Sequence, residues 1–251
     1  MYQSCVLQVP LQPEKPPMTT NPNHRNTHIV ILLDRSGSME SIAGDIVGGF
    51  NQFLRGQAEA GTDARVTFVQ FDSQSPQEVI VAGAPIAEIV PLTRATFVPR
   101  GGTPLLDATG QLISRIEANQ AARETAGLPK EDIVFVSITD GEENESREFT
   151  LARIRQLVTE KQAQGWTFVF LSAALDVYGE AQAMGVGAGS VQAFRADARG
   201  TGLAFADLNL KMTQFRTKKR QGLDTAADPF FGDDKPAEDH RNGKTGGSSD
   251  E

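Results

Sequence analysis

The stretch that decides the fold is Ile29–Glu40, which reads IVILLDRSGSME. Its five leading apolar residues predict a strand that is buried on both faces of a parallel sheet. The strand ends abruptly at Asp34, and Ser36 and Ser38 follow at alternate positions. A carboxylate and two hydroxyls directly after a buried strand indicate either a capped polar turn or part of a binding site. The rest of the chain decides between these two interpretations.

Strand-like and helix-like patterns alternate along the chain after this stretch. Further buried strands are expected at 64–73, 131–139 and 166–176, and a hairpin or a pair of edge strands is expected at 77–92. Helices are expected at 40–58, 104–120, 146–165, 177–187 and 203–220. Strands that alternate with helices favour a parallel sheet with right-handed crossovers. The expected fold class is therefore α/β, with a doubly wound, mostly parallel sheet and helices on both faces.

The composition changes at both ends of the chain. Residues 1–26 are rich in Pro, Asn and Thr without periodicity, so we expect a disordered N-terminal extension, with Met18 as the true start. Residues 221–251 are expected to form a disordered acidic and polar tail. Within this tail, DPFF at 228–231 is either a short docking element or a chance pair of aromatics. A single domain is expected between the two ends, at 27–220.

The bulk composition narrows the class of function. The 251 residues carry a formal net charge of −8, which disfavours binding to nucleic acid, so the basic run 215–220 is interpreted as a solvated helix end. One cysteine, Cys5, excludes an intrachain disulfide framework and a multi-cysteine zinc site. No run is long enough to span a membrane, and the N-terminus lacks the features of a signal peptide. We therefore expect a cytoplasmic protein that binds neither nucleic acid nor membrane.

Three polar loops carry the candidate site. In an open parallel sheet, functional groups gather beyond the carboxyl ends of the strands. The loops are DRSGS at 34–38, RGGTP at 100–104 and TDGEEN at 139–144. They offer carboxylates from Asp34 and Asp140 and hydroxyls from Ser36, Ser38 and Thr103. Such a set of oxygen donors suits a hard cation such as Mg²⁺, whose charge two carboxylates roughly balance.

The same five residues carry a resemblance to a known family. Asp34, Ser36 and Ser38, then Thr103 in GGTPLLDA, then Asp140 in TDG resemble the complete metal-ion-dependent adhesion site (MIDAS) of von Willebrand factor type A (VWA) domains. The segment 165–187 resembles the last strand and helix of bacterial and phage cytoplasmic members. The resemblance covers about residues 26–194 and implies a Rossmann-like VWA fold. It implies that the hydroxyls bind Mg²⁺, or Mn²⁺, and that the aspartates bind it directly or through water. A Glu or Asp of a partner protein completes the shell.

The resemblance implies a metal-dependent protein-binding module that is not an enzyme. Intracellular members often serve multiprotein assemblies, so an AAA-type ATPase or a stress-response complex is one expected partner. The competing interpretation is a Mg-dependent phosphotransferase or phosphatase of the haloacid-dehalogenase type, which also has an apolar strand ending in Asp. That chemistry needs a second carboxylate two residues later as general acid and base, and Ser36 stands at this position.

Simpler structural roles compete with the metal site when each residue is taken alone. Ser38 has the chemistry to cap the helix that follows it, and Thr103 has the chemistry to cap the next one. Asp140 in TDG is also typical of a turn. The metal site is favoured because all five residues occur together and in order.

Four acidic residues near the site are expected to have other roles. Asp107 is expected on a helix surface or behind the metal ligands. The remaining three form a solvated acidic rim, with a second cation there as the alternative interpretation: Glu142, Glu143 and Glu145.

Overall fold

The computed structural model describes residues 26–226 and 228–243. The expected disorder of residues 1–26 and the expected start at Met18 concern residues outside this range, apart from Asn26. Within the described residues, no helix combines the length and the apolar character that crossing a lipid bilayer requires.

A six-stranded sheet forms the centre of the domain, with the strand order β3-β2-β1-β4-β5-β6. All neighbouring strands are parallel except β2 and β3. The central strand β1 is buried at all eight positions, as its continuous apolar run predicts. The bounds are β1 Thr27–Asp34, β2 Ala64–Asp72, β3 Ser75–Pro85, β4 Asp132–Thr139, β5 Thr167–Ser172 and β6 Val191–Ala193. The predicted fold class is confirmed.

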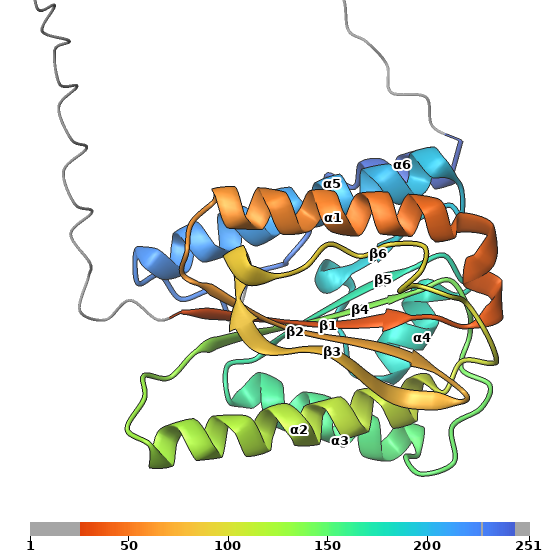
Figure 1. Ribbon diagram of the computed structural model, residues 1–251. Helices are drawn as coiled ribbons and strands as arrows, with labels where there is room; N and C mark the ends of the chain where they lie inside the picture. The colour runs from red at the N-terminus through yellow and green to blue at the C-terminus, as the bar shows by residue number, and fades with distance from the viewer. Residues whose placement is uncertain (1–25, 227, 244–251) are drawn as a thin grey trace, which may run out of the picture.

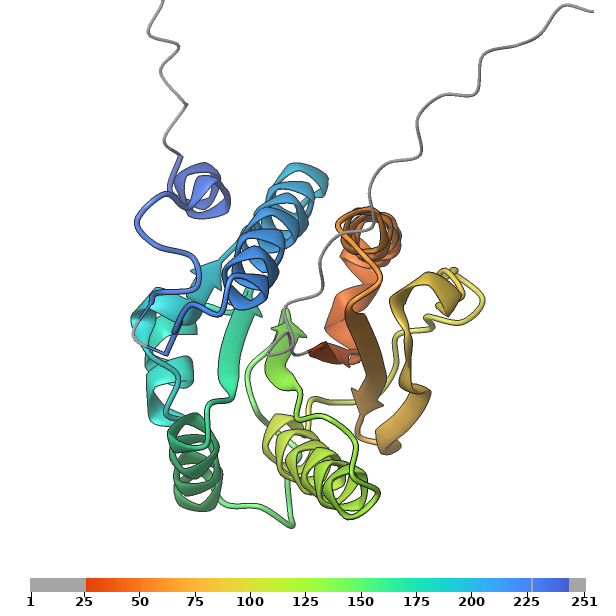
Figure 2. The same cartoon turned by 90° about the vertical axis from the view of Figure 1, so that its left-hand side faces the viewer.

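Helices cover both faces of this sheet, as Figures 1 and 2 show. One layer contains α1 Ala43–Glu59, α5 Ala198–Arg220 and α6 Pro236–Arg241. The opposite layer contains α2 Leu105–Thr125, α3 Leu151–Ala163 and α4 Val177–Ala183. Short 3-10 helices occur at η1 Gly37–Ile42, η2 Ile86–Glu88 and η3 Ala188–Ser190.

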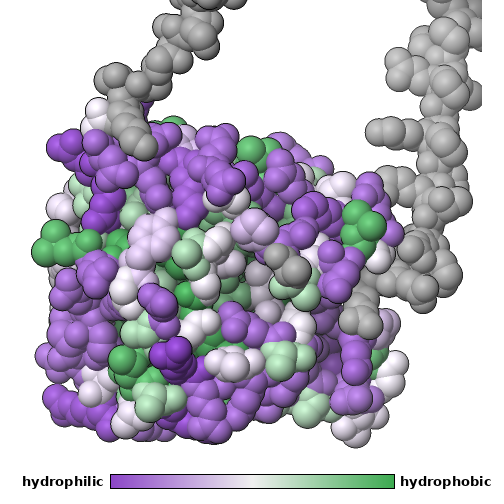
Figure 3. Space-filling model, turned by 180° about the vertical axis from the view of Figure 1, so that it is seen from behind, coloured by the Kyte–Doolittle hydropathy of each residue, from purple (hydrophilic) through white to green (hydrophobic). Residues whose placement is uncertain are grey.

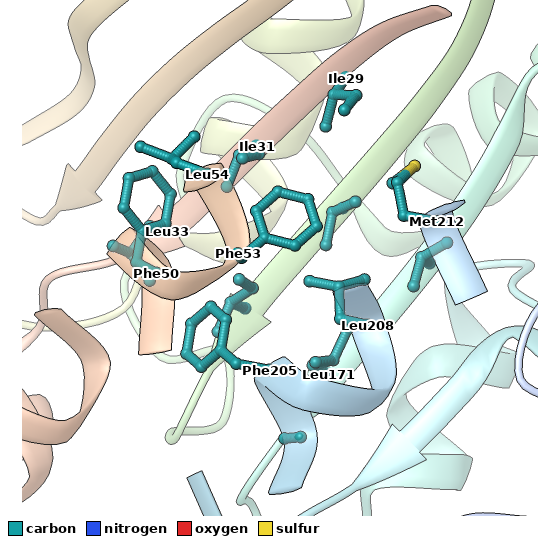
Figure 4. Packing of buried hydrophobic residues seen from close by; sticks show 14 of the residues in the cluster. Ile29, Ile31, Leu33, Phe50, Phe53, Leu54, Leu171, Phe205, Leu208 and Met212 are labelled. Carbon is teal, nitrogen blue, oxygen red and sulfur yellow. The ribbon is translucent and has the colours of Figure 1, made fainter. Parts of the chain in front are cut away.

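Alternate residues of β1 face the two helical layers. Ile29, Ile31 and Leu33 pack with the aromatic and aliphatic side chains of α1 and α5, as Figure 4 shows. Val30 and Leu32 belong to the second core cluster, beneath α2, α3 and α4. Two separate apolar cores therefore hold the central strand from both sides and fix the position of its last residue at the sheet edge.

The segment 77–92 differs from the expected hairpin or pair of edge strands. Only one strand, β3, forms there, and it pairs with β2. The turn lies earlier in the chain because the Oδ1 of Asp72 accepts hydrogen bonds from the backbone N–H groups of Gln74 and Ser75, at 2.8 and 2.9 Å. After β3 the chain continues through η2 into the loop that approaches the candidate site.

The described part of the tail corrects the expected disorder after residue 221. Phe230 is 8 % exposed and Phe231 is fully buried, and the ring of Phe230 lies 6.3 Å from that of Phe215 on α5. DPFF is therefore a docking element. Beyond it, α6 lies beside β6, where Glu238 accepts the Ala193 N–H at 2.9 Å. The prediction of disorder was wrong because the burial of these two aromatic rings stabilises the segment, although most of its other residues are polar or glycine.

The basic run at the end of α5 also differs from its interpretation as a solvated helix end. The side chain of Arg216 is fully buried. Its Nη1 donates to the backbone O of Gln57 at 2.6 Å, and its Nη2 donates to the backbone O of Gly61 at 2.8 Å. It also forms an ion pair with Asp63 at 2.5 Å. This arginine therefore joins the last turns of α5 to the end of α1.

The surface offers few large apolar side chains to a partner. Figure 3 shows hydrophilic residues over much of the face seen from behind, with hydrophobic ones among them. The two most exposed large apolar residues in the described range are Leu175 and Val90, at 90 % and 81 %, and they belong to different loops. Single exposed apolar residues of this kind are normal on a protein surface.

Candidate metal centre

The three polar loops meet at the carboxyl edge of β1 and β4. These strands are parallel neighbours, with Leu33 opposite Ile138, so the residues that follow them leave the sheet side by side. The loop before α2 lies against the loop after β1, because the Gly37 N–H donates to the Gly101 O at 3.0 Å. Gly101 has a φ of +67°, which glycine adopts without strain.

Asp34 is held in one orientation from two sides. Its side chain is fully buried at the end of β1. The backbone N–H of Ser36 donates to its Oδ1 at 2.6 Å, and the hydroxyl of Thr139 donates to its Oδ2 at 2.6 Å. Thr139 itself accepts the Gly141 N–H at 3.1 Å. The carboxylate of β1 is thus positioned by the last residue of β4.

The serine hydroxyls connect Asp34 to Asp140. The Oγ atoms of Ser36 and Ser38 lie 3.0 Å apart, and the hydroxyl of Ser38 donates to the Oδ1 of Asp140 at 2.6 Å. A β-carbon at Gly141 would lie 3.2 Å from the Oγ1 of Thr103 and 3.4 Å from the Oγ of Ser38. Both hydroxyls therefore border the space above this glycine. The structure brings all five predicted residues to one place.

The hydroxyls are not helix caps. Ser38 lies inside η1, whose N-cap is Ser36, and the hydroxyl of Ser38 donates to Asp140. Thr103 comes before Pro104, the N-cap of α2, and neither N-cap position shows a side-chain capping hydrogen bond. Thr103 is instead held through its backbone, because its N–H donates to the Oδ1 of Asn144 at 2.8 Å and its O accepts the Asn144 N–H at 3.2 Å. This leaves the Thr103 side chain for the site.

The electrostatics of the two carboxylates favour a bound cation. Burial raises the pKa of Asp34 to about 7, although the hydrogen bonds from Thr139 and Ser36 oppose this rise. Burial also raises the pKa of Asp140. Across the described residues, neither aspartate forms an ion pair with a Lys, Arg or His. A divalent cation would supply the missing positive charge, and an all-oxygen donor set fits Mg²⁺ or Mn²⁺.

The hydroxyls are essential to this donor set. Within residues 26–226 and 228–243, no group of three His, Cys, Asp or Glu side chains is arranged to hold a metal ion. Two carboxylates alone leave most of an octahedral shell to other ligands. The serine and threonine oxygens, together with water, therefore have to fill the remaining positions of any bound ion.

The acidic residues near the site differ in role. Asp107 is buried and accepts the backbone N–H groups of Arg147, Glu148 and Phe149, so it anchors the loop after β4, behind the metal ligands. Glu143, expected in the solvated rim, instead accepts the Leu106 N–H at 2.8 Å near the start of α2. Both carboxylates therefore hold the loop that carries Asp140.

Two residues that position the site were not predicted from the sequence. Thr139 orients Asp34, and Asn144 holds Thr103. Both lie within TDGEEN, the loop that the sequence singled out for Asp140. The sequence does show that each of these short polar side chains lies near Asp140. It does not show their partners, Asp34 and Thr103, because these are distant in sequence and come close only in the folded sheet.

Glu180 gives a pH-dependent prediction. Burial raises the pKa of this α4 residue to about 7 from its ordinary value of 4.5, and Glu142, Glu143 and Asp176 add to the rise. The folded protein therefore binds a proton that the unfolded chain releases, and stability falls as the pH rises from about 4.5 to about 7. We expect Glu180→Gln to raise the Tm by a few degrees at about pH 8, since about 1 kcal/mol shifts Tm by about 2–4 °C.

Thermal unfolding at about pH 4 and about pH 8 checks this prediction. At the lower pH the wild-type carboxyl is protonated in both states, so the substitution should change little. The exposed Glu59, at the end of α1, provides the matched control as Glu59→Gln. An equal change in Tm at both pH values would contradict the assignment of this pH dependence to Glu180.

Comparison with known proteins places the chain by its fold. No protein-family model matches the sequence, and no curated protein matches it in sequence. The pilus adhesin SpaC from Lactobacillus rhamnosus GG, in its open conformation, is similar in structure, with a TM-score of 0.57 and 15 % identity over 78 % of this chain and 31 % of SpaC. Proximal thread matrix protein 1 from the mussel byssus has a TM-score of 0.50 and 15 % identity, over 76 % of this chain and 47 % of that protein.

At this low sequence identity, the similarity to both proteins is one of fold. The chain spans about a third of SpaC and about half of the mussel protein. The VWA domain of SpRpn10 is also found, with a TM-score of 0.49 and 11 % identity over 73 % of this chain and 95 % of that domain. The strand order and the helical layers confirm the predicted doubly wound α/β fold, and the similarity to SpaC and to the mussel protein agrees with it.

Proposed function

We propose that this protein is a divalent-metal-dependent protein-binding module. Mg²⁺, or Mn²⁺, is held by Asp34, Ser36, Ser38, Thr103 and Asp140, as in a MIDAS, and a carboxylate of the partner completes its shell. One observation carries the proposal: five oxygen donors from three loops meet at one edge of the sheet, and their two carboxylates have no basic partner in the described residues. A cation of charge +2 balances the two aspartates and still attracts an anionic oxygen.

Binding is favoured over catalysis by the groups beside Asp34. A phosphotransferase of the haloacid-dehalogenase type needs a general acid and base two residues after its nucleophile. Ser36 occupies that position, and its hydroxyl lies 3.0 Å from that of Ser38. We therefore propose a non-enzymatic role. SpaC is described as a pilus adhesin, and an adhesive role for a protein of similar fold is compatible with this proposal.

Calorimetric titration of Mg²⁺ into the intact protein tests the metal site. We expect Thr103→Ala to weaken Mg²⁺ binding by about 10-fold or more, because the variant loses one oxygen donor. Thr103→Ser is the matched control, since it keeps the hydroxyl and should bind Mg²⁺ nearly as well as the wild type. Thermal unfolding in EDTA verifies that both variants remain folded.

The partner is tested with the same pair of variants. Proteins captured by the wild type and by Thr103→Ser in Mg²⁺ should be lost in EDTA and with Thr103→Ala. Equal Mg²⁺ affinity in Thr103→Ala and wild type would refute the metal site. Partners that survive both EDTA and Thr103→Ala would instead refute binding through the metal.

A further inference from the structure

Exposed carboxylates lie on the loop after β4 and around α4, beside the candidate metal centre. We define the acidic rim as five residues on the two loops beside the site and on α4. Four of them are exposed and Glu180 is half-buried. The rim consists of Glu142, Glu145, Glu148, Asp176 and Glu180.

Contacts place three residues of the acidic rim relative to the candidate ligands, all on the loop after β4 or on α4 beside it. Glu142 follows Asp140 by two residues. The Cγ of Glu145 lies 2.5 Å from the position of a β-carbon at Gly102, which places this side chain beside Thr103. Glu180 accepts the backbone N–H of Glu143 at 3.3 Å, which joins α4 to this same loop.

The charges of the acidic rim are mostly uncompensated. Among the ion pairs of the described residues, Arg147 is the basic partner of this rim, at 3.6 Å from Glu145, and its side chain is 87 % exposed. The raised pKa of Glu180 has a related cause: after burial, the nearby carboxylates Glu142, Glu143 and Asp176 make its ionisation unfavourable. The rim thus produces a negative potential around the site.

A structural role accounts for some acidic residues here but not for Glu142 and Glu145. Glu143 uses its carboxylate for the backbone of this loop and of α2, with the Ser146 N–H at 2.7 Å. Rim residues such as Glu142 and Glu145 are instead turned to solvent. They are therefore available to a partner that approaches the metal.

The rim sets a condition on the partner. Asp34 and Asp140 already balance a divalent ion, so the net charge seen by an approaching carboxylate is that of the rim. A partner acid without neighbouring cations would be repelled at the distances over which exposed charges act, about 8 Å at physiological salt. A lysine or arginine on each side of this acid would meet the rim carboxylates while the acid reaches the metal.

We infer that the metal centre selects a partner segment in which one acidic residue is flanked by lysine or arginine. This inference rests on the proposed function, since the central acid is the group that would bind the metal. The rim then supplies specificity, because it attracts a basic-flanked acid and repels an acid within an acidic segment.

Three synthetic peptides of equal length test this inference, each with a single central aspartate. Their sequences are Ser-Lys-Asp-Lys-Ser, Ser-Gly-Asp-Gly-Ser and Ser-Glu-Asp-Glu-Ser, each with the same fluorescent label. Fluorescence anisotropy measures their binding to the full chain in Mg²⁺, with EDTA as the metal-free control. We expect the lysine-flanked peptide to bind about five- to ten-fold more tightly than the glutamate-flanked one at low salt, with a smaller difference at high salt.

Charge reversal on the protein completes the test. The double variant Glu142→Lys/Glu145→Lys should lose or reverse the preference for lysine flanks. The control Glu59→Lys/Glu160→Lys changes the net charge equally at exposed helical positions outside the rim, and it should keep the preference.

The possible outcomes distinguish a failure of this inference from a failure of the proposed function. Mg²⁺-dependent binding with equal affinity for all three peptides would overturn this inference and leave the proposed function standing. A preference retained by Glu142→Lys/Glu145→Lys would also overturn the role of the rim. Absence of any Mg²⁺-dependent binding would overturn the proposed function and, with it, this inference.

Discussion

Arg216→Ala is expected to lower the free energy of unfolding by about 3 kcal/mol, the range typical when one partner of a buried ion pair is removed. The guanidinium is fully buried and serves four acceptors on α1 and the loop after it. Its loss leaves the backbone oxygens of Gln57 and Gly61 without these donors in a dry environment. Asp63 keeps a partner in Arg220, at 2.6 Å, which limits the loss.

Urea denaturation followed by circular dichroism measures this effect. Arg199→Ala is the matched control, because Arg199 lies on the same helix and is exposed. We expect the control to change the unfolding free energy by less than about 0.5 kcal/mol. If Arg216→Ala were as small in effect as Arg199→Ala, the buried position of the guanidinium would be wrong.

Asp34→Asn is expected to weaken Mg²⁺ binding by about 100-fold or more, since it removes one of the two charges that balance the ion. The side chains have nearly the same shape, so the Ser36 N–H keeps an acceptor at this position. In EDTA the variant should be at least as stable as the wild type, because a buried carboxylate without a cation costs free energy. A loss of metal binding without a loss of stability distinguishes a ligand from a structural residue.

Calorimetry in Mg²⁺ and thermal unfolding in EDTA provide these two readouts. Asp224→Asn is the control, because Asp224 is exposed beyond the end of α5, at the opposite end of the domain from the site. Unchanged Mg²⁺ affinity in Asp34→Asn would show that Asp34 is not a ligand. A lower Tm in EDTA would show that the carboxylate supports the fold itself.

The parts of the fold with strong local patterns could be predicted from the sequence. The apolar runs that end at Asp34 and Thr139 are β1 and β4, and their parallel arrangement follows from the alternation of strands with helices, whereas their order in the sheet comes from the structure alone. The loops at their carboxyl ends carry the candidate ligands, because the edge of a parallel sheet gathers such groups. Four of the five candidate ligands lie at or shortly after the ends of these two strands, and Thr103 lies in the glycine loop before α2, so the sequence could point to all five.

Features that depend on partners distant in sequence could not be predicted. Arg216 lies in a run of basic residues, and nothing local shows that Gln57 and Asp63 would enclose it. Thr139 orients Asp34 across 105 positions of sequence, and DPFF packs on α5 despite its polar surroundings. Local composition indicates which segments favour contact with water. The contacts of Arg216, Thr139 and DPFF form only when the helices pack on the sheet, so local composition does not reveal them.

The segment beside β6 has a consequence for the size of the smallest stable unit. Lys235 donates to the Val191 O at 2.7 Å and Glu238 accepts the Ala193 N–H, so two side chains satisfy the backbone of the last strand of the sheet. In a chain shortened to residue 220, the backbone groups of this strand would lose these two partners and become exposed. Exposed edge strands can pair with strands of neighbouring molecules, so we expect the shortened chain to aggregate. Residues 228–243 thus cover the edge of β6 and belong to the folded domain.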